Sequence, residues 1–184
     1  MPDGARVRRI EPPAGIRRLR TLPRADYEDA FELTLGPAVP VRTAEQWIRE
    51  MLEGAPANTR GRLVLGWTAL GLRLGSRDDP GRVLGWEVRS SEPDAVVLGA
   101  ESRIGMPAEL LLLREPERLV FSTQVRHGNP AVRVLWATVE QPHLRIVPAL
   151  LAAAGERVAE GARVRRSRAG GSAARAGRPA HDGP

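Results

Sequence analysis

The stretch NPAVRVLWATVEQPHLRIVPALL, residues 129–151, decides the fold of this chain. Asn129 and Pro130 are typical of a helix start, because Asn caps the first turn and Pro fits its first position. Apolar residues then recur at steps of one, three and four, a helical period that one histidine joins. The members of this stripe are Val132, Leu135, Trp136, Val139, His143, Ile146, Val147, Leu150 and Leu151. The stripe predicts a helix of about 25 residues, kinked at Pro142 and Pro148, since proline removes a backbone hydrogen bond.

Four runs of strand-like sequence precede this helix, separated by short polar turns. Runs of this kind at spacings of about 10–12 residues indicate antiparallel hairpins. The runs are RVLGWEVRSS (82–91), DAVVLGAESRIG (94–105), PAELLLLREP (107–116) and ERLVFSTQVRHG (117–128). An earlier run, DYEDAFELTL (26–35), places Tyr27, Asp29, Phe31 and Leu33 on one face, which predicts a fifth strand.

Two shorter helices are predicted between the first strand and the four later ones. Thr43 and Gln46 have the spacing of a capping box, and Gly54 ends the helix that they begin. Residues 57–74 carry a second apolar stripe at helical spacing. The order of elements therefore predicts an α+β fold of about five strands, in which an antiparallel sheet packs against a long C-terminal helix.

The net charge of +6 is concentrated at the two ends of the chain. Residues 1–24 hold seven arginines against two acids, and residues 155–184 hold seven against three. Residues 25–154 carry 14 arginines and 17 acids and are mildly acidic. The ends lack a sustained apolar period, which predicts a disordered Arg-rich segment over 1–25, a folded domain over 26–158 and a disordered tail over 159–184.

Composition excludes several classes of function. The chain has no cysteine, so disulfides, thiolate metal sites and a cysteine nucleophile are ruled out. No apolar run approaches the roughly 20 residues of a membrane span, and the basic N-terminus lacks the apolar core of a signal peptide. We therefore expect a cytoplasmic protein with no cofactor, no metal site and no integral membrane segment. A monomer is the default expectation.

Two histidines lie in the predicted folded part, His127 at the end of the last strand and His143 within the apolar stripe. The simplest interpretation of His143 is a buried ring that is hydrogen-bonded to a backbone carbonyl. The simplest interpretation of His127 is a half-exposed residue at a strand end. The alternative is a polar group in a cavity, where a histidine is suited to acid–base chemistry because its ordinary pKa is about 6.5.

Glu101 is the candidate partner for such a histidine. Glu101, Arg103 and Glu109 lie on neighbouring predicted strands. A carboxyl group in an apolar cavity can serve as a general acid. Cross-strand salt bridges on the outer face of the sheet are the simpler interpretation of the same three residues.

The order of elements resembles the START-like helix-grip superfamily, also called SRPBCC, over about residues 26–158. Within it, DYEDAFELTL, the hairpins of 84–130 and LWATVEQPHLRIVPALL (135–151) resemble a bacterial domain of unknown function, the DUF 2867 type. The resemblance implies a curved sheet that grips the long helix, with a cavity between them. Members of the superfamily bind lipids, sterols or polyketides, and a few are cyclases or dehydratases. Larger members usually have seven strands, more than the five counted here.

The resemblance implies a non-catalytic domain that binds a small apolar molecule between the sheet and the C-terminal helix. The residues expected to contact such a ligand are Trp86, Phe121, Trp136, Val139 and His143. One alternative is an enzyme of the polyketide cyclase or dehydratase kind that uses His143 or His127 with Glu101. A second alternative is contact of the arginine-rich tails with nucleic acid or an anionic membrane, without specific nucleic-acid recognition.

Overall fold

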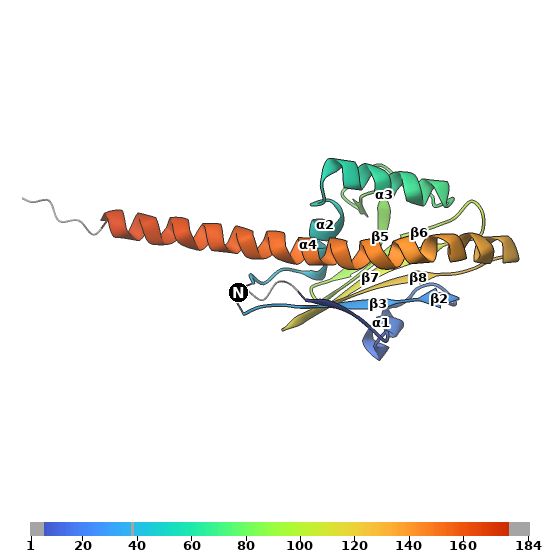
Figure 1. The fold of residues 1–184 in the computed structure, drawn as a ribbon, viewed down its shortest axis with the longest axis horizontal. Helices are drawn as coiled ribbons and strands as arrows, with labels where there is room; N and C mark the ends of the chain where they lie inside the picture. Colours follow the sequence, from blue (N-terminus) through green and yellow to red (C-terminus); the bar gives the residue numbers. More distant parts are fainter. Residues whose placement is uncertain (1–5, 38, 177–184) are drawn as a thin grey trace, which may run out of the picture.

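A curved antiparallel sheet wraps around one side of a long C-terminal helix in this computed structural model, which describes residues 6–37 and 39–176 (Figure 1). The strands are β1 (Val7–Ile10), β2 (Tyr27–Glu28), β3 (Ala30–Thr34), β4 (Arg82–Val83), β5 (Trp86–Glu92), β6 (Ala95–Ala100), β7 (Ala108–Glu115) and β8 (Arg118–Val125). The helices are α1 (Ala14–Leu19), α2 (Ala44–Leu52), α3 (Ala57–Ala69) and α4 (Pro130–Ala176). This is the α+β helix-grip architecture that the sequence predicts.

The four predicted hairpin strands form a continuous meander. Each of β5 to β8 pairs antiparallel with the next, and β3 pairs with the far side of β8, where Phe31 lies opposite Phe121. The order across the sheet is β1-β3-β8-β7-β6-β5-β4, with β2 also paired to β8. The meander confirms the hairpin assignment, because strands joined by tight turns lie side by side.

The sheet has eight strands, so the predicted number of five is wrong. The three additional strands are β1, β2 and β4, and none has more than four residues. β4 is separated from β5 by Leu84 and Gly85, both with positive φ, within a run that the sequence predicts as one strand. β2 and β3 also lie within a single predicted strand, 26–35, and are separated at Asp29. Strands this short carry too few alternating residues to give a pattern of their own.

The N-terminal segment is folded where the sequence predicts disorder. β1 pairs with β3, and α1 covers the outer face of the sheet. Ile16 of α1 is 0% exposed and packs with Ala30, Val97, Leu111 and Val120. The segment has only one or two apolar residues in each short element, which explains why it shows no period. Residues 1–5 lie outside the described residues.

The two short helices begin and end largely as predicted. The Thr43 side chain accepts a hydrogen bond from the Gln46 backbone N–H, and the Gln46 side chain accepts one from Thr43, which confirms the capping box. α3 ends at Ala69, five residues earlier than predicted, and Gly71 follows with a φ of +75°. That left-handed backbone favours glycine and cannot continue a helix.

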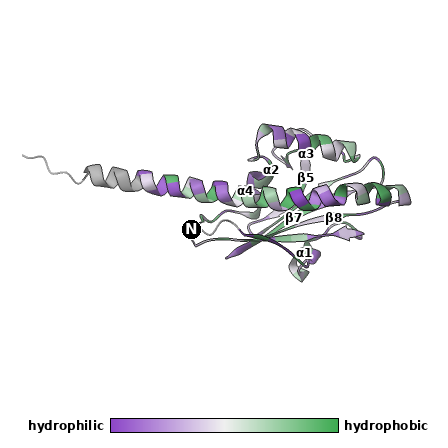
Figure 2. Ribbon diagram, viewed as in Figure 1, coloured by the Kyte–Doolittle hydropathy of each residue, from purple (hydrophilic) through white to green (hydrophobic). Residues whose placement is uncertain are grey.

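α4 is one unbroken helix of 47 residues that runs through Pro142 and Pro148, longer than the predicted stripe. Its buried side continues to Val158 and Ala162, and the helix then extends beyond the sheet to Ala176 (Figure 1). In its part up to Arg168, the extension carries four arginines, at positions 163, 165, 166 and 168 (Figure 2). Part of the predicted disordered tail is therefore helical, since alanine and arginine are strong helix formers. Residues 177–184 lie outside the described residues.

The main core lies between α4, α2 and the inner face of the sheet. α4 contributes Trp136, Val147 and Leu151, and α2 contributes Trp47, Ile48, Met51 and Leu52. These side chains pack on inner-face residues of β3, β6, β7 and β8, namely Phe31, Leu33, Val96, Leu98, Leu110, Leu112, Leu119 and Phe121. Burial of a large apolar side chain contributes roughly 1.5–3 kcal/mol, so this contact is the principal source of stability.

We predict that Ile16→Ala lowers the free energy of unfolding by about 2–5 kcal/mol, because it leaves a cavity beneath α1. Urea denaturation followed by circular dichroism measures the loss. Leu65→Ala, at a position 71% exposed on α3, is the control and changes stability by less than about 1 kcal/mol. Equal effects of the two substitutions contradict the packing of α1 on the sheet.

Candidate functional site

Four rings and one carboxylate gather beneath the N-terminal part of α4. They are Tyr27 of β2, Asp29 between β2 and β3, His127 just after β8, and Trp136 and His143 of α4, and we call them the His143 cluster. The Trp136 ring lies at its centre, with centroid distances of 4.7 Å to Tyr27, 5.4 Å to His143 and 6.4 Å to His127. The cluster brings together residues that are far apart in sequence, since β2 lies near the start of the domain and α4 at its end.

Asp29 is the acceptor at the base of the cluster. Its side chain is 0% exposed and accepts hydrogen bonds at 2.9 Å from the Thr123 backbone N–H and from the Tyr27 hydroxyl. Its second oxygen, Oδ2, also lies 2.9 Å from His143 Nε2. A buried carboxylate is costly unless it is paired and hydrogen-bonded, and these three partners meet that condition.

His143 pairs with this carboxylate and not with a backbone carbonyl, so the simplest interpretation of its role is wrong. Its side chain is 17% exposed, and Nδ1 has no hydrogen bond within the described part of the chain. With the proton on Nε2 donated to Asp29, Nδ1 carries a lone pair that faces away from the carboxylate. His143 can therefore accept a hydrogen bond or a proton from a molecule bound next to α4.

His127 lies on the other side of Trp136. Its backbone N–H donates to Asp26 Oδ2 at 2.8 Å, and its Nε2 is buried without a partner among the described residues. Burial lowers the pKa of the His127 ring, and the nearby Asp26 carboxylate opposes this only in part. The hydrogen bond from the His127 backbone lowers the pKa of Asp26. The ring of His127 is therefore held neutral more firmly than an exposed histidine.

Three polar atoms around the cluster are buried with no hydrogen-bond partner among the described residues: His127 Nε2, Trp136 Nε1 and Thr123 Oγ1. Leaving a buried donor or acceptor unpaired costs about 1–3 kcal/mol. Such groups mark a place where a water or the polar part of a ligand completes the hydrogen bonding. The pKa of Tyr27 is raised by burial and by the Asp29 charge, so its hydroxyl stays protonated and donates to Asp29.

Glu101 lies outside the cluster. It is exposed and accepts a hydrogen bond from Arg89 at 2.7 Å on the outer face of the sheet. Arg89 also contacts the buried Glu109 at 2.9 Å, and the Thr21 backbone N–H donates to Glu109. Glu101 and Glu109 thus form cross-strand salt bridges, as the simpler interpretation expected, but their partner is Arg89 and not Arg103. The carboxylate beside His143 is Asp29 instead. In the sequence, Asp29 is the single acid on the apolar face of the 26–35 run, and this position was the signal that could have identified it.

The residues predicted to bind an apolar ligand lie in different environments. Trp86 and Phe121 are almost fully buried in the main core, and the edge of Trp86 meets Trp67 of α3 at 5.3 Å between centroids. Trp136 is mostly buried, whereas Val139 and His143 are half-buried. Val139 and the cluster residues are therefore the more accessible members of the set.

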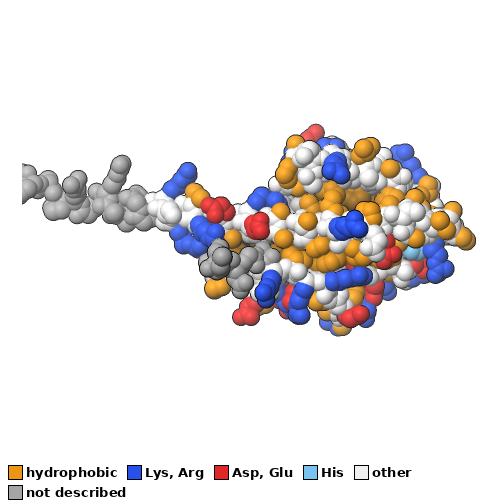
Figure 3. Space-filling model, in the orientation of Figure 1, with side chains coloured by type: hydrophobic (Ala, Val, Ile, Leu, Met, Phe, Trp, Pro, Cys, Tyr) orange, Lys and Arg blue, Asp and Glu red, His pale blue; other side chains and the backbone are white. Residues whose placement is uncertain are grey.

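Hydrophobic side chains are visible in the depression between the lobe that carries α3 and the helix α4 (Figure 3). Val64 and Trp67 of α3, and Leu70 directly after it, are half-buried against the core. On α4, Val139 is likewise half-buried and packs against the main core.

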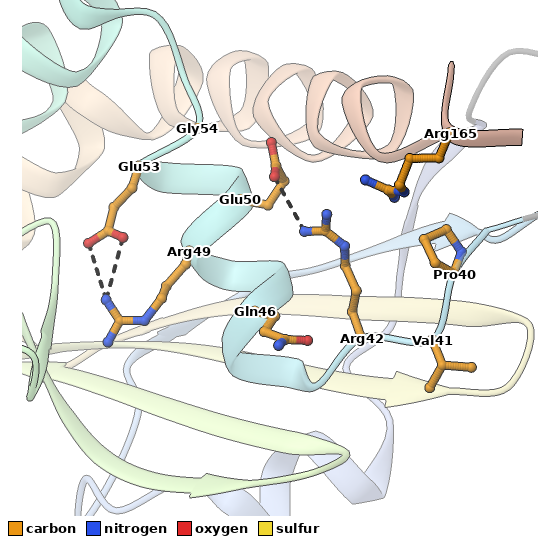
Figure 4. Close-up of a pocket in the computed structure, with 9 residues that line it drawn as sticks. All are labelled: Pro40, Val41, Arg42, Gln46, Arg49, Glu50, Glu53, Gly54 and Arg165. Atoms are coloured by element: carbon orange, nitrogen blue, oxygen red, sulfur yellow. Dashed lines mark hydrogen bonds and ion pairs between the residues drawn. The ribbon is translucent and has the colours of Figure 1, made fainter. Parts of the chain in front are cut away.

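Two clefts are open to the surface. One, of about 450 Å³, lies at the ends of β1 and β2 and is lined by Arg9, Ile10, Glu11, Pro12, Glu28 and Asp29. The other, of about 680 Å³, lies beside α2 (Figure 4). Asp29 lines the first cleft, which places its opening next to the His143 cluster. Neither cleft is lined by Trp86, Phe121, Trp136, Val139 or His143.

Two further findings concern metals and membranes. Among the described residues, no group of three or more His, Asp or Glu side chains is arranged to hold a metal ion. Within the same residues, no helix has both the length and the apolarity to cross a membrane. The arginines of the α4 extension, Arg163 to Arg168, are exposed, and their contact with nucleic acid or membrane stays a prediction.

No protein-family model and no curated protein sequence matches this chain. The crystal structure of CalU16 from Micromonospora echinospora is similar over 86% of this chain and 91% of its own, with 12% sequence identity and a TM-score of 0.33. A similarity at that level carries no conclusion about function. The helix-grip fold rests on the sheet and helix described above, and the resemblance to the DUF 2867 type is not confirmed.

We predict that the protein loses stability as the pH falls below about 6.5, partly through His127. Its folded pKa is lowered, so between that value and the ordinary pKa the unfolded chain binds a proton that the folded chain resists. His127→Gln reduces the loss between about pH 7 and 5, measured by urea denaturation at each pH. Protonation of Asp26 does not contribute to the loss in this pH range, because the pKa of Asp26 is lowered from its ordinary value of 3.8. An unchanged pH dependence contradicts the burial of this ring.

Proposed function

We propose that this protein is a START-like domain that binds a small, largely apolar molecule with one polar end, without chemical conversion. The apolar part lies in the depression between α3 and α4, and the polar end reaches the His143 cluster. The observation that carries the proposal is the set of unpaired buried polar atoms next to half-buried apolar side chains of α4. Ligand sites of proteins combine these two properties, an apolar lining and a few placed polar groups.

The geometry of α4 supports continuity between the apolar and polar parts. Val139 follows Trp136 by almost one helical turn, and His143 follows Val139 by slightly more than one turn. A ligand that contacts Val139 is thus about one helical turn from Trp136 on one side and from His143 on the other. Trp136 offers a donor and His143 an acceptor, so a hydroxyl or carbonyl group is a suitable polar end.

Binding without catalysis is favoured because the described residues around the cluster contain a single hydrogen-bonded acid–base pair. His143 and Asp29 are hydrogen-bonded, but Glu101 lies on the outer face of the sheet and His127 Nε2 has no carboxylate partner. Asp29 has three hydrogen-bond partners and serves to orient His143. The arrangement is suited to holding a polar group in one orientation.

Binding is tested with protein purified from its own host and with Nile red, a neutral apolar dye. Native mass spectrometry is expected to detect a co-purified small molecule, and Nile red fluorescence is expected to rise on binding. We predict that Val139→Glu weakens dye binding at least about tenfold, because it places a charge against the apolar part of the site.

Val134→Glu is the matched control, since Val134 lies on the same helix but is 68% exposed. It is expected to leave the dye affinity unchanged, while both variants keep the circular dichroism spectrum of the parent. The proposal fails if no molecule co-purifies and if Val139→Glu binds the dye as well as Val134→Glu does.

Acid–base catalysis by His143 is the second candidate function, and the 2.9 Å contact between His143 Nε2 and Asp29 Oδ2 favours it. A carboxylate that fixes the tautomer of a histidine leaves the other ring nitrogen free to take a proton from a substrate. Here that nitrogen is Nδ1 on the partly exposed edge of the ring. A polyketide-like substrate is what the START-like resemblance implies for such a reaction.

The two functions are distinguished by comparing the molecules that co-purify with different variants from the same host. If His143 catalyses a reaction, His143→Gln retains the substrate, and its co-purified mass differs from that of the parent protein. Under the binding proposal, both proteins carry the same molecule, and we predict this result with a lower occupancy in the variant. Val134→Gln serves as the exposed control on the same helix.

A further inference from the structure

A second site is formed where α2 meets the C-terminal part of α4, at the cleft of about 680 Å³ (Figure 4). Its wall is made by Arg42, Gln46 and Glu50 around α2 and by Arg165 of α4. Along α4, Arg165 is 22 residues beyond His143, which corresponds to about 33 Å at 1.5 Å per residue. The cleft is therefore separate from the His143 cluster.

Glu50 and Glu53 are the carboxylates that line this cleft, and Arg157 pairs with Glu50. Arg157 Nε contacts Glu50 Oε1 at 2.7 Å, and Arg157 Nη2 donates to the Glu50 carbonyl at 2.6 Å. Gly54 permits this approach, because a Cβ there would lie 3.2 Å from Arg157 Nη2 and 2.4 Å from the Glu50 carbonyl oxygen. The charge of Glu50 is thus largely neutralised by Arg157.

Arg42 has one long contact with a carboxylate, and Arg165 has none within the described part of the chain. Arg42 is 27% exposed and has one contact, at 3.4 Å, from Nη1 to Glu50 Oε2. A guanidinium carries five N–H donors, so most of those of Arg42 have no partner among the described residues. Arg165 has no hydrogen bond or ion pair within the described part of the chain. The two guanidinium groups point toward one another across the cleft (Figure 4).

The remaining charges of the wall are paired among themselves. Arg49 bridges Glu45 at 2.8 Å and Glu53 at 3.4 Å. Gln46 uses its side-chain oxygen to accept from the Thr43 backbone N–H, which leaves its amide N–H groups free to donate. The cleft therefore presents donors from Arg42, Arg165 and Gln46, with two positive charges that repel each other when nothing lies between them.

We propose that this cleft binds a phosphate group between Arg42 and Arg165, with Gln46 as a third donor. A phosphate monoester has three terminal oxygens and a charge of about −1.5 to −2 at neutral pH, which matches two guanidinium groups and one amide. Guanidinium groups bind phosphate through charge-assisted hydrogen bonds, the strongest class in proteins. The phosphate group belongs either to a small metabolite or to a lipid headgroup.

The full chain is titrated with inorganic phosphate by calorimetry and, separately, with vesicles of phosphatidylcholine with and without phosphatidic acid. Saturable binding of phosphate is expected, tightening as the pH rises through the second pKa of phosphate, where it gains its second charge. Arg165→Gln and Arg42→Gln are each expected to weaken binding about tenfold or more, because each removes charge-assisted hydrogen bonds.

Arg163→Gln is the matched control. Arg163 lies two residues before Arg165 on the same helix and contacts Glu160 at 3.5 Å, and it does not line the cleft. It removes the same charge, so it is expected to change binding less than about twofold. Arg165 is exposed, so its substitution leaves folding intact even if Arg42→Gln does not fold.

The two probes identify the source of the phosphate group. Binding of free phosphate that depends on Arg165 supports a soluble phosphorylated ligand, and binding only to phosphatidic acid vesicles with the same dependence supports a lipid headgroup. The proposal is overturned if neither probe binds. It is also overturned if Arg163→Gln weakens binding as much as Arg165→Gln, since general attraction of anions to the basic helix then explains the result.

Discussion

Burial of one side of α4 against the inner face of the sheet is the interaction on which the rest of the structure depends. Leu151 and Trp136 of α4 pack in the same core as Phe31, Leu112 and Phe121 of the sheet. Each large buried side chain contributes roughly 1.5–3 kcal/mol, and α4 contributes several. The curved sheet can bury its inner face only if a long element fills it, and α4 meets this requirement. Both candidate sites lie along this helix because it alone runs the full length of the domain and beyond it (Figure 1).

The His143 cluster is the polar exception within that contact. Asp29 lies at the break between β2 and β3, where the Thr123 backbone N–H is free to donate to its side chain. A carboxylate can remain in an apolar interface when its hydrogen bonds are complete, and here Tyr27 and His143 complete them. Trp136, enclosed by the surrounding rings, keeps an unpaired N–H. The polarity is thus concentrated at one end of α4, where a bound molecule can reach it from the half-buried flank of the helix.

The second site depends on the same helix for a different reason. α4 continues past the last buried position, Ala162, and this continuation brings Arg165 to Arg42, which lies in the loop before α2. Arg157 fixes the relation between the two elements through its contacts with Glu50. Because α4 is one continuous helix, its rise of 1.5 Å per residue sets the distance between the His143 cluster and the cleft beside α2. A molecule bound at one site does not reach the other unless it is about 30 Å long.

The sequence by itself determined the elements whose patterns are local. The α4 stripe, the four hairpin strands and the Thr43–Gln46 capping box are each set by neighbouring residues, so periodicity and cap chemistry predict them. Only the tertiary structure decided which distant residues meet. His143 and Asp29 are 114 residues apart in sequence. The alternation of side chains along a strand assigns Glu101 and Asp29 to a face of the sheet, but it does not show which face α4 covers. β1, β2 and β4 are stabilised by their neighbouring strands, and Ile16 by the sheet beneath it, so these elements leave no local pattern. Contacts of this kind arise from packing of the whole chain, which explains why the carboxylate partner of His143 was predicted wrongly while the helix that carries it was predicted correctly.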